Sequence, residues 1–268
     1  MKVVLFCGGQ GLRLRDYAEN VPKPMVPIGY RPIVWHLMRY YAHYGHTEFI
    51  LCLGYKADVI KDYFLHYQEA ISNDFVLSNG GKSVQLLGKD ISDWKITFCD
   101  TGIGSNIGQR LWAVREHIGN DEMFLANYAD GLSDVPIDDM IEDLHKHPET
   151  VGNFIVTRPA QTFHTVVLDG EGYVTKFAPV TSDEVWVNGG FFCLRREIFD
   201  HMKPGEELVL DPFDRLIARR RLRGYRYEGF WACMDTFKEK QTLEDVYAQG
   251  NAPWEPWKQL APDARRSA

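Results

Sequence analysis

The sequence has few cysteines, and no two of them are closely spaced. They form an odd-numbered set, Cys7, Cys52, Cys99, Cys193 and Cys233. This pattern argues against a disulfide framework and against zinc fingers, which need paired spacings. Most of the five lie in short apolar runs, where cysteine commonly serves as a small core residue. The set fits a reducing compartment, and we predict a cytoplasmic location.

Long apolar runs are also absent. No segment approaches the roughly 18 apolar residues of a membrane-spanning helix, and the apolar run at the start is too short for a secretory signal. An excess of basic residues is lacking as well, because the formal net charge is −7. Nucleic-acid partners usually require a basic surface. We therefore expect neither a nucleic-acid partner nor a membrane.

The chain instead alternates short apolar runs with helix-like segments. Strands are predicted at 3–6, 49–53, 94–102 and 122–131, and helices at 32–45, 56–70, 108–119 and 137–146. Further along, the pattern predicts hairpins at 74–87 and 163–179 and helices at 211–221 and 237–249. This rhythm predicts an α/β fold with a Rossmann-like, mostly parallel mixed sheet flanked by helices and a small inserted β portion. We expect one domain over residues 1–250 and a partly flexible C-terminal extension over 251–268.

A glycine-rich, basic loop follows the first predicted strand. Gly8, Gly9 and Gly11 would let backbone N–H groups approach phosphate oxygens, and Arg13 and Lys23 would supply positive charge. The loop has neither the Walker A sequence nor the dinucleotide-binding G-x-G-x-x-G pattern. Its glycines therefore leave two interpretations open, a phosphate site and a surface loop with incidental charge. Its place at the carboxyl end of a strand is where open parallel sheets bind ligands.

Two aspartates are candidate metal ligands. Asp130 follows an apolar strand, where a carboxylate can hold Mg²⁺ or Mn²⁺ against phosphates, and Asp235 precedes a predicted helix. Each also has an ordinary interpretation, Asp130 as a turn residue before glycine and Asp235 as a helix N-cap. We expect Asp134 to help cap the helix that follows it. Asn188 and Gly189 lie within a strand pattern, where glycine indicates a bulge or a closely approaching ligand.

Taken together, these segments resemble the sugar-1-phosphate nucleotidyltransferases, and among them the glucose-1-phosphate cytidylyltransferases. The similarity covers roughly residues 1–250. "GGQGLRL…PKPMVPIG" is similar to the family's G-G-x-G-T-R-L…P-K-P signature, and "DTGIGSNIGQRL", "YADGLSD", "WVNGGFF" and "GFWACMDT" follow in the family's order. Each motif alone is weak, and their order carries the resemblance.

The resemblance implies a GT-A-like nucleotidyltransferase fold and a metal-dependent reaction. A sugar-1-phosphate would attack the α-phosphorus of a nucleoside triphosphate, and pyrophosphate would leave. Arg13 and Lys23 would act on the phosphates, and Asp130 and Asp235 would bind Mg²⁺ or Mn²⁺. The nucleotide would lie on a larger set of residues, Gly8, Gly9, Gly11, Arg13, Lys23, Thr101, Gly102 and Gly108. The implied partners are a nucleotide or nucleotide-sugar and a sugar phosphate. The aromatic segments 35–44 and 252–257 leave a homo-oligomer open.

The sequence departs from the family on the sugar side. The family's threonine in G-T-R is Leu12, and its E-K-P motif is missing near residues 179–180. In the family this glutamate holds sugar hydroxyls and this lysine holds the sugar phosphate. The nearby Lys176 is a candidate replacement, which would bind the sugar together with Asn188 and Gly189. The family's R-F-G reads T-F-H here and ends at His164, which is either an acid or base near the sugar or a polar strand residue.

Three hypotheses follow from these departures. The first is a nucleotidyltransferase with a remodelled sugar pocket. The second is an isomerase or mutase, for example between pyranose and furanose forms, that acts on a preformed nucleotide-sugar. Such an enzyme needs no lysine for a free sugar phosphate, whose unpaired charge would be costly to bury. The third is a non-catalytic nucleotide-sugar binding protein, against which the retained Lys23, Asp130 and Asp235 argue. The sequence leaves the base and the sugar open.

Overall fold

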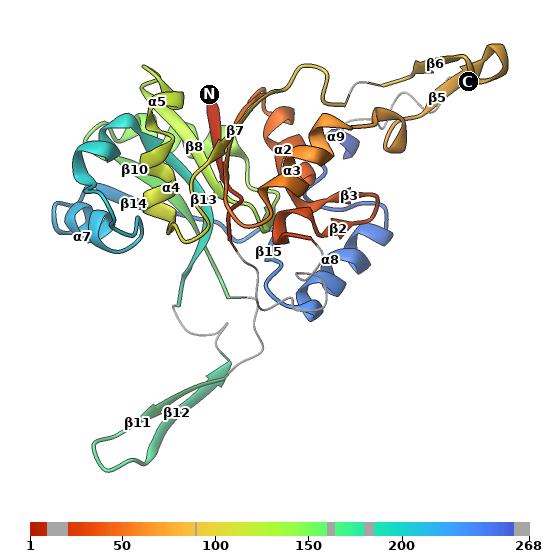
Figure 1. Ribbon diagram of the computed structural model, residues 1–268. Helices are drawn as coiled ribbons and strands as arrows, with labels where there is room; N and C mark the ends of the chain where they lie inside the picture. The colour runs from red at the N-terminus through yellow and green to blue at the C-terminus, as the bar shows by residue number, and fades with distance from the viewer. Residues whose placement is uncertain (10–20, 89, 160–163, 180–184, 260–268) are drawn as a thin grey trace.

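A single large sheet lies at the centre of the computed structural model, which describes residues 1–9, 21–88, 90–159, 164–179 and 185–259 (Figure 1). The sheet has seven strands in the order β14-β10-β13-β8-β1-β4-β7. In that order the strands are Leu222–Arg226, Gly152–Thr157, Val187–Arg195, Met123–Tyr128, Lys2–Phe6, Glu48–Leu53 and Lys95–Asp100.

All but one strand of this sheet run in the same direction. β1 pairs in parallel with β4 and β8, β4 with β7, and β10 with β14. β13 is antiparallel to both β8 and β10 and joins the two parallel parts. The carboxyl ends of the other strands therefore meet at one edge, where β13 begins. The predicted mostly parallel mixed sheet is confirmed, and this edge is the place where such sheets bind ligands.

Helices cover both faces of the sheet because its strands are apolar on both sides. On β1, Val3 and Leu5 pack into one core, whereas Val4 and Phe6 pack into the other. The first core is covered by α2 (Ile33–His43), α3 (Ala57–Leu65), α6 (Ile137–Lys146) and α8 (Phe237–Ala248). The second is covered by α4 (Ile107–Ala113), α5 (Arg115–Ile118) and α7 (Asp211–Ala218).

Two hairpins stand away from the sheet (Figure 1). β5 (Phe75–Ser78) and β6 (Ser83–Leu86) form the first, and Asn79 and Gly80 adopt the positive φ that the predicted turn requires. β11 (His164–Leu168) and β12 (Val174–Pro179) form the second, which is the predicted inserted β portion. In Figure 1 this second hairpin projects from the edge at which β10 ends and β13 begins.

The C-terminal segment contributes to the first core. Ala252 and Trp254 are fully buried there, and α9 (Pro256–Gln259) follows them. The predicted boundary at residue 250 therefore falls inside the packed part of the chain, and residues 260–268 lie outside the described residues. The aromatic residues of α2 are likewise core residues, since Tyr40 and Tyr41 are almost completely buried. Within the described ranges, no helix has the length and apolar character needed to cross a membrane.

Candidate active site

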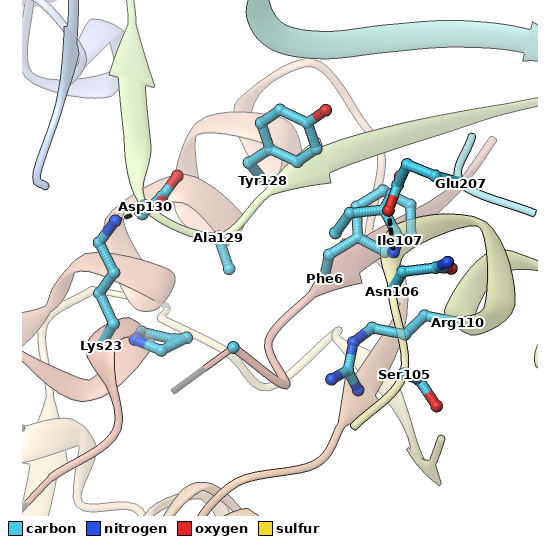
Figure 2. Close-up of a pocket in the computed structure, with 12 residues that line it drawn as sticks. Phe6, Lys23, Ser105, Asn106, Ile107, Arg110, Tyr128, Ala129, Asp130 and Glu207 are labelled. Carbon is cyan, nitrogen blue, oxygen red and sulfur yellow. Dashed lines mark hydrogen bonds and ion pairs between the residues drawn. The ribbon is translucent and has the colours of Figure 1, made fainter. Parts of the chain in front are cut away.

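Lys23 joins two aspartates at the ligand-binding edge of the sheet. Its Nζ donates to Asp130 Oδ2 and to Asp235 Oδ1, each at 2.5 Å (Figure 2 shows the first contact). Since both oxygens lie 2.5 Å from one nitrogen, they are at most about 5 Å apart. Lys23 begins a short 3-10 turn (η2, Lys23–Met25), which the buried Pro24 and Met25 anchor in the fold. Two carboxylates far apart in the sequence thus converge on one cation.

A small two-stranded ladder brings the two aspartates together. β9 (Gly131–Ser133) directly follows Asp130, and β15 (Trp231–Cys233) ends just before Asp235. The strands pair antiparallel with Gly131 opposite Cys233, and Met234 N donates to Asp130 O at 2.9 Å. This register places Asp130 beside the backbone that leads to Asp235.

The interpretation of Asp235 as a helix N-cap is wrong. The N-cap of α8 is Thr236, whose side chain accepts from Glu239 N, while the Glu239 carboxylate accepts from Thr236 N and Asp235 N. The capping box is complete without the Asp235 carboxylate, which accepts from Lys23 instead. The capping role expected of Asp134 is also wrong. Pro136 is the N-cap of α6, and Asp134 accepts a hydrogen bond from the Tyr227 hydroxyl.

The electrostatics of this cluster favour a cation. Burial disfavours the charged form of Lys23, but Asp130 and Asp235 outweigh it and raise the pKa of the ammonium above its usual value. The Asp130 and Asp235 side chains keep 30% and 31% of their surface exposed, so a ligand can reach them. Carboxylate oxygens suit hard divalent ions such as Mg²⁺, and the pair fits such an ion. The described residues contain no group of three or more His, Cys, Asp or Glu side chains placed for a metal.

A cavity of about 380 Å³ adjoins Lys23 and Asp130 (Figure 2). Its walls come from the carboxyl ends of β1 and β8, from the start of α4 and from the η2 turn. The lining residues are Phe6, Gly9, Lys23, Pro24, Ser105, Asn106, Ile107, Arg110, Tyr128, Ala129, Asp130 and Glu207.

Arg110 lines this cavity and was missed by the sequence analysis. Its guanidinium donates to Gly8 O at 3.0 Å, to Thr101 Oγ1 at 2.7 Å and to Gly102 O at 3.0 Å. The side chain is only 3% exposed, and burial lowers the pKa of the guanidinium. Arg110 thus fixes the loop after β1 to the loop after β7. The sequence feature that could have identified Arg110 is its place as a charged residue inside an apolar helical segment.

The predicted nucleotide-binding residues gather around Arg110, although several of them have packing roles. A Cβ at Gly108 would lie 2.2 Å from the backbone atom Glu206 O, so this position requires glycine, and a Cβ at Gly8 would lie 2.0 Å from the Arg110 guanidinium, which would have to move. Gly102 adopts a φ of +90°, and Thr101 Oγ1 donates to Leu53 O at 2.7 Å.

Of the other two predicted phosphate-binding glycines, the structure describes Gly9 and not Gly11. Gly9 lines the cavity, and a Cβ added there would meet no atom within 4 Å. This glycine is therefore not required by packing, in contrast to Gly8. Gly11 and Arg13 lie outside the described residues.

The predicted sugar-binding residues divide into two groups. At the start of β13, Asn188 Nδ2 donates to the Tyr128 hydroxyl at 3.4 Å, close to the cavity. Gly189 is buried, and its carbonyl accepts from Trp231 Nε1 at 2.8 Å. His164 and Lys176 lie on the projecting hairpin of β11 and β12, and neither lines the cavity (Figure 1).

On that hairpin the His164 ring stacks on Phe177, with 4.9 Å between ring centroids. Lys176 lies opposite Val167. The described structure does not bring either residue to the cluster of Lys23, Asp130 and Asp235, and their roles stay predictions. Residues 160–163 and 180–184, which include the first two residues of the altered R-F-G motif and Val180 beside the missing E-K-P motif, lie outside the described residues.

Residues 2–232 match the model of the family described as "Nucleotidyl transferase", and the chain belongs to this family. It is 36% identical to the "Probable glucose-1-phosphate cytidylyltransferase" of Bacillus subtilis, over 96% of this chain and 100% of that protein. The glucose-1-phosphate cytidylyltransferase of Salmonella typhi is also 36% identical, with the same coverage. The predicted resemblance to sugar-1-phosphate nucleotidyltransferases is confirmed.

The fold is shared with solved structures as well. HddC from Yersinia pseudotuberculosis, complexed with GMP-PN, superposes with a TM-score of 0.65 at 17% identity. The match covers 92% of this chain and 99% of that one. Members of the family generally use a divalent metal ion, which agrees with the paired carboxylates described above.

Proposed function

We propose that this protein is a cytoplasmic sugar-1-phosphate nucleotidyltransferase, which joins a nucleoside triphosphate and a sugar-1-phosphate and releases pyrophosphate. The convergence of Asp130 and Asp235 on the Lys23 ammonium, beside a cavity at the carboxyl ends of β1 and β8, carries the proposal. CTP and glucose 1-phosphate are the first substrates to test, because the relatives at 36% identity are named for that pair.

The reaction needs positioning and charge stabilisation rather than a protein nucleophile. In an in-line displacement, negative charge grows on the oxygens around the α-phosphorus, and a nearby ammonium lowers the barrier. We assign this role to Lys23, which its neighbours hold in the charged form. Asp130 and Asp235 would hold Mg²⁺ or Mn²⁺. That ion, when bound, supplies Lewis-acid polarisation of the phosphate oxygens.

The nucleotide is proposed to lie between the loop after β1 and the loop after β7. Backbone groups at Gly8 and Gly9 would face the phosphates, and Thr101 and Gly102 would border the base. Arg110 supports this assignment because its hydrogen bonds fix Gly8 and Gly102 relative to each other. Gly11 and Arg13 are assigned to the same phosphates on the motif alone, and Gly108 supports the loop through packing.

One assay with two arms tests the proposal. The purified chain with Mg²⁺ or Mn²⁺ is given each nucleoside triphosphate with a panel of sugar-1-phosphates, and products are identified by mass spectrometry. We expect pyrophosphate and a nucleotide-sugar in this arm. The second arm offers finished nucleotide-sugars alone. A product of unchanged mass and new retention time there, with no pyrophosphate in the first arm, would replace the transferase by the isomerase or mutase.

A further inference from the structure

Two arginines and a tryptophan gather at the same edge of the sheet as the proposed active site. The guanidinium carbon of Arg158 lies 4.0 Å from the centroid of the Trp186 ring, and that of Arg226 lies 5.5 Å from it. Arg158 directly follows β10, Trp186 directly precedes β13, and Arg226 ends β14. We call these three residues the arginine–tryptophan cluster.

The strand order places this cluster on the side of the active site opposite the proposed base. Asp130 follows β8, and the Thr101–Gly102 loop follows β7, on the far side of β1 and β4. In the other direction from β8 come β13, β10 and β14. A substrate whose nucleotide half lies toward β7 therefore extends its sugar half toward β13 and β10.

The strands that lead to Arg158 and to Asp130, β10 and β8, are separated by one strand of the sheet. β10 is two strands from β8, which corresponds to about 10 Å between their backbones at the usual strand spacing. Asn188 lies between these two strands, since it pairs with Val156 of β10 and donates to the Tyr128 hydroxyl of β8. Arginine side chains that start at β10 and β14 can extend from there toward a sugar phosphate over β13.

The chemistry of the cluster matches what the sequence lacks. A sugar-1-phosphate brings a doubly charged phosphate, and the lysine that holds it in the family's E-K-P motif is missing here. Among the described residues at this edge of β10, β13 and β14, the cationic side chains are those of Arg158 and Arg226. Arginine can bind phosphate through two parallel N–H···O bonds. The face of Trp186 orients the guanidinium groups by cation–π attraction, and each guanidinium carries five N–H donors.

We propose that Arg158 and Arg226, oriented by Trp186, bind the phosphate of the sugar-1-phosphate in place of the lysine that the family carries in E-K-P. This inference rests on the proposed function and specifies which side chains of that site hold the second substrate. Arg158 and Arg226 are binding residues, and Trp186 is a positioning residue.

The test compares the KM values of the two substrates. Wild-type enzyme, Arg158→Gln, Arg226→Gln and the double variant are assayed with Mg²⁺, glucose 1-phosphate and CTP. Glutamine keeps much of the length and the polarity and removes the charge. Because a hydrogen bond to a charged group contributes about 1.5–3 kcal/mol, each single variant should raise the KM for glucose 1-phosphate about tenfold or more. The double variant should raise it further, and the KM for CTP should change by less than about twofold.

Three further variants separate binding from folding. Arg219→Gln removes an exposed arginine after α7, away from the cluster, and should behave like the wild type. Arg158→Lys should recover part of the affinity, since it restores the charge without the bidentate geometry. Lys176→Gln tests the rival replacement for the missing lysine. A tenfold rise in the KM for glucose 1-phosphate in Lys176→Gln, with no change in the double arginine variant, would overturn the proposal.

Failure of this inference is distinguishable from failure of the proposed function. If wild-type enzyme releases no pyrophosphate with any substrate pair, both are overturned. If it does and the double variant has wild-type KM values, only the assignment of the arginines is overturned. A parallel rise in both KM values together with a lower Tm would show that the cluster only holds the base of the hairpin, which also overturns the assignment.

Discussion

The proposed metal side and the proposed sugar side of the active site differ in how closely the sequence motifs and the structure agree. On the metal side, Lys23, Asp130 and Asp235 stand in the motifs that resemble the family's, and Lys23 contacts both aspartates. On the sugar side, the family motif is missing, and His164 and Lys176 lie on a hairpin that projects from the sheet (Figure 1). Phosphoryl transfer needs stabilisation of the charge on the phosphate oxygens whatever the second substrate is, whereas a sugar pocket must match one particular sugar.

The same contrast appears in burial. Lys23 is 12% exposed and is held by the carboxylates of two separate segments. The residues of β11 and β12 are mostly exposed, and each strand pairs only with the other in the described structure. Such a two-stranded unit is marginally stable in water on its own. Lys23 and its two carboxylates thus hold charges in fixed positions, whereas the hairpin presents most of its residues to solvent.

The largest effect is expected from the two proposed metal ligands. Asp130→Asn and Asp235→Asn each remove one of two carboxylates, so both should lower kcat about 100- to 1000-fold or more with Mg²⁺. Turnover is measured as pyrophosphate release, and circular dichroism controls for folding. Glu48→Gln, at an exposed carboxylate paired with Lys95, is a matched control that should keep wild-type kcat. Wild-type activity in either aspartate variant would contradict the assignment of these carboxylates as metal ligands.

Lys23→Met should lower kcat by about 100-fold, since it removes the cation assigned to the α-phosphate while keeping a long apolar stem. It also leaves the carboxylates of Asp130 and Asp235 without the ammonium between them. Their repulsion should lower Tm in EDTA, and added Mg²⁺ should raise the Tm of the variant more than that of the wild type. Thermal unfolding of the variant and the wild type, with and without Mg²⁺, measures these changes in Tm. An equal response of both proteins to Mg²⁺ would argue that the divalent ion binds elsewhere.

Sequence patterns identified Lys23 and Asp130, because both follow predicted strands at an edge where ligands bind. They could not show that Asp130 and Asp235 lie side by side at Lys23, since this arrangement depends on the register of β9 with β15. Local rules favoured a capping role for Asp235, and only the completed box of Thr236 and Glu239 shows otherwise.

Arg110 and the arginine–tryptophan cluster were missed for a related reason. Their partners come from separate strands and loops, and a pattern in one segment does not reveal them. The hairpins and most helices were predictable because their periodicity and turn residues are local. The C-terminal boundary of the domain could not be predicted in this way, since it depends on whether Trp254 reaches the core.

A smaller effect is expected at the glycines after β1. Gly8→Ala would place a Cβ 2.0 Å from the Arg110 guanidinium, so Arg110 must shift and its bonds to Gly8 and Gly102 must weaken. We expect a loss of about 1–3 kcal/mol in the free energy of unfolding and a higher KM for CTP. Gly9→Ala is the matched control for stability, because no atom lies within 4 Å of its added Cβ. Urea unfolding of both variants measures the difference, and equal stabilities would contradict the packing role of Gly8.

The smallest effect is expected from Lys176→Ala, and it sharpens the contrast between the two sides. Sequence position alone made Lys176 the candidate for the missing lysine, but it lies on β12 of the projecting hairpin. If the arginine–tryptophan cluster holds the sugar phosphate, removing this charge should change the KM for glucose 1-phosphate by less than about twofold, as is usual for exposed charges. Steady-state assays at saturating CTP decide this. A rise of tenfold or more would mean that the hairpin folds over the site during turnover. The sugar side would then hold its charged residues at the substrate as the metal side does, but only in the presence of substrate.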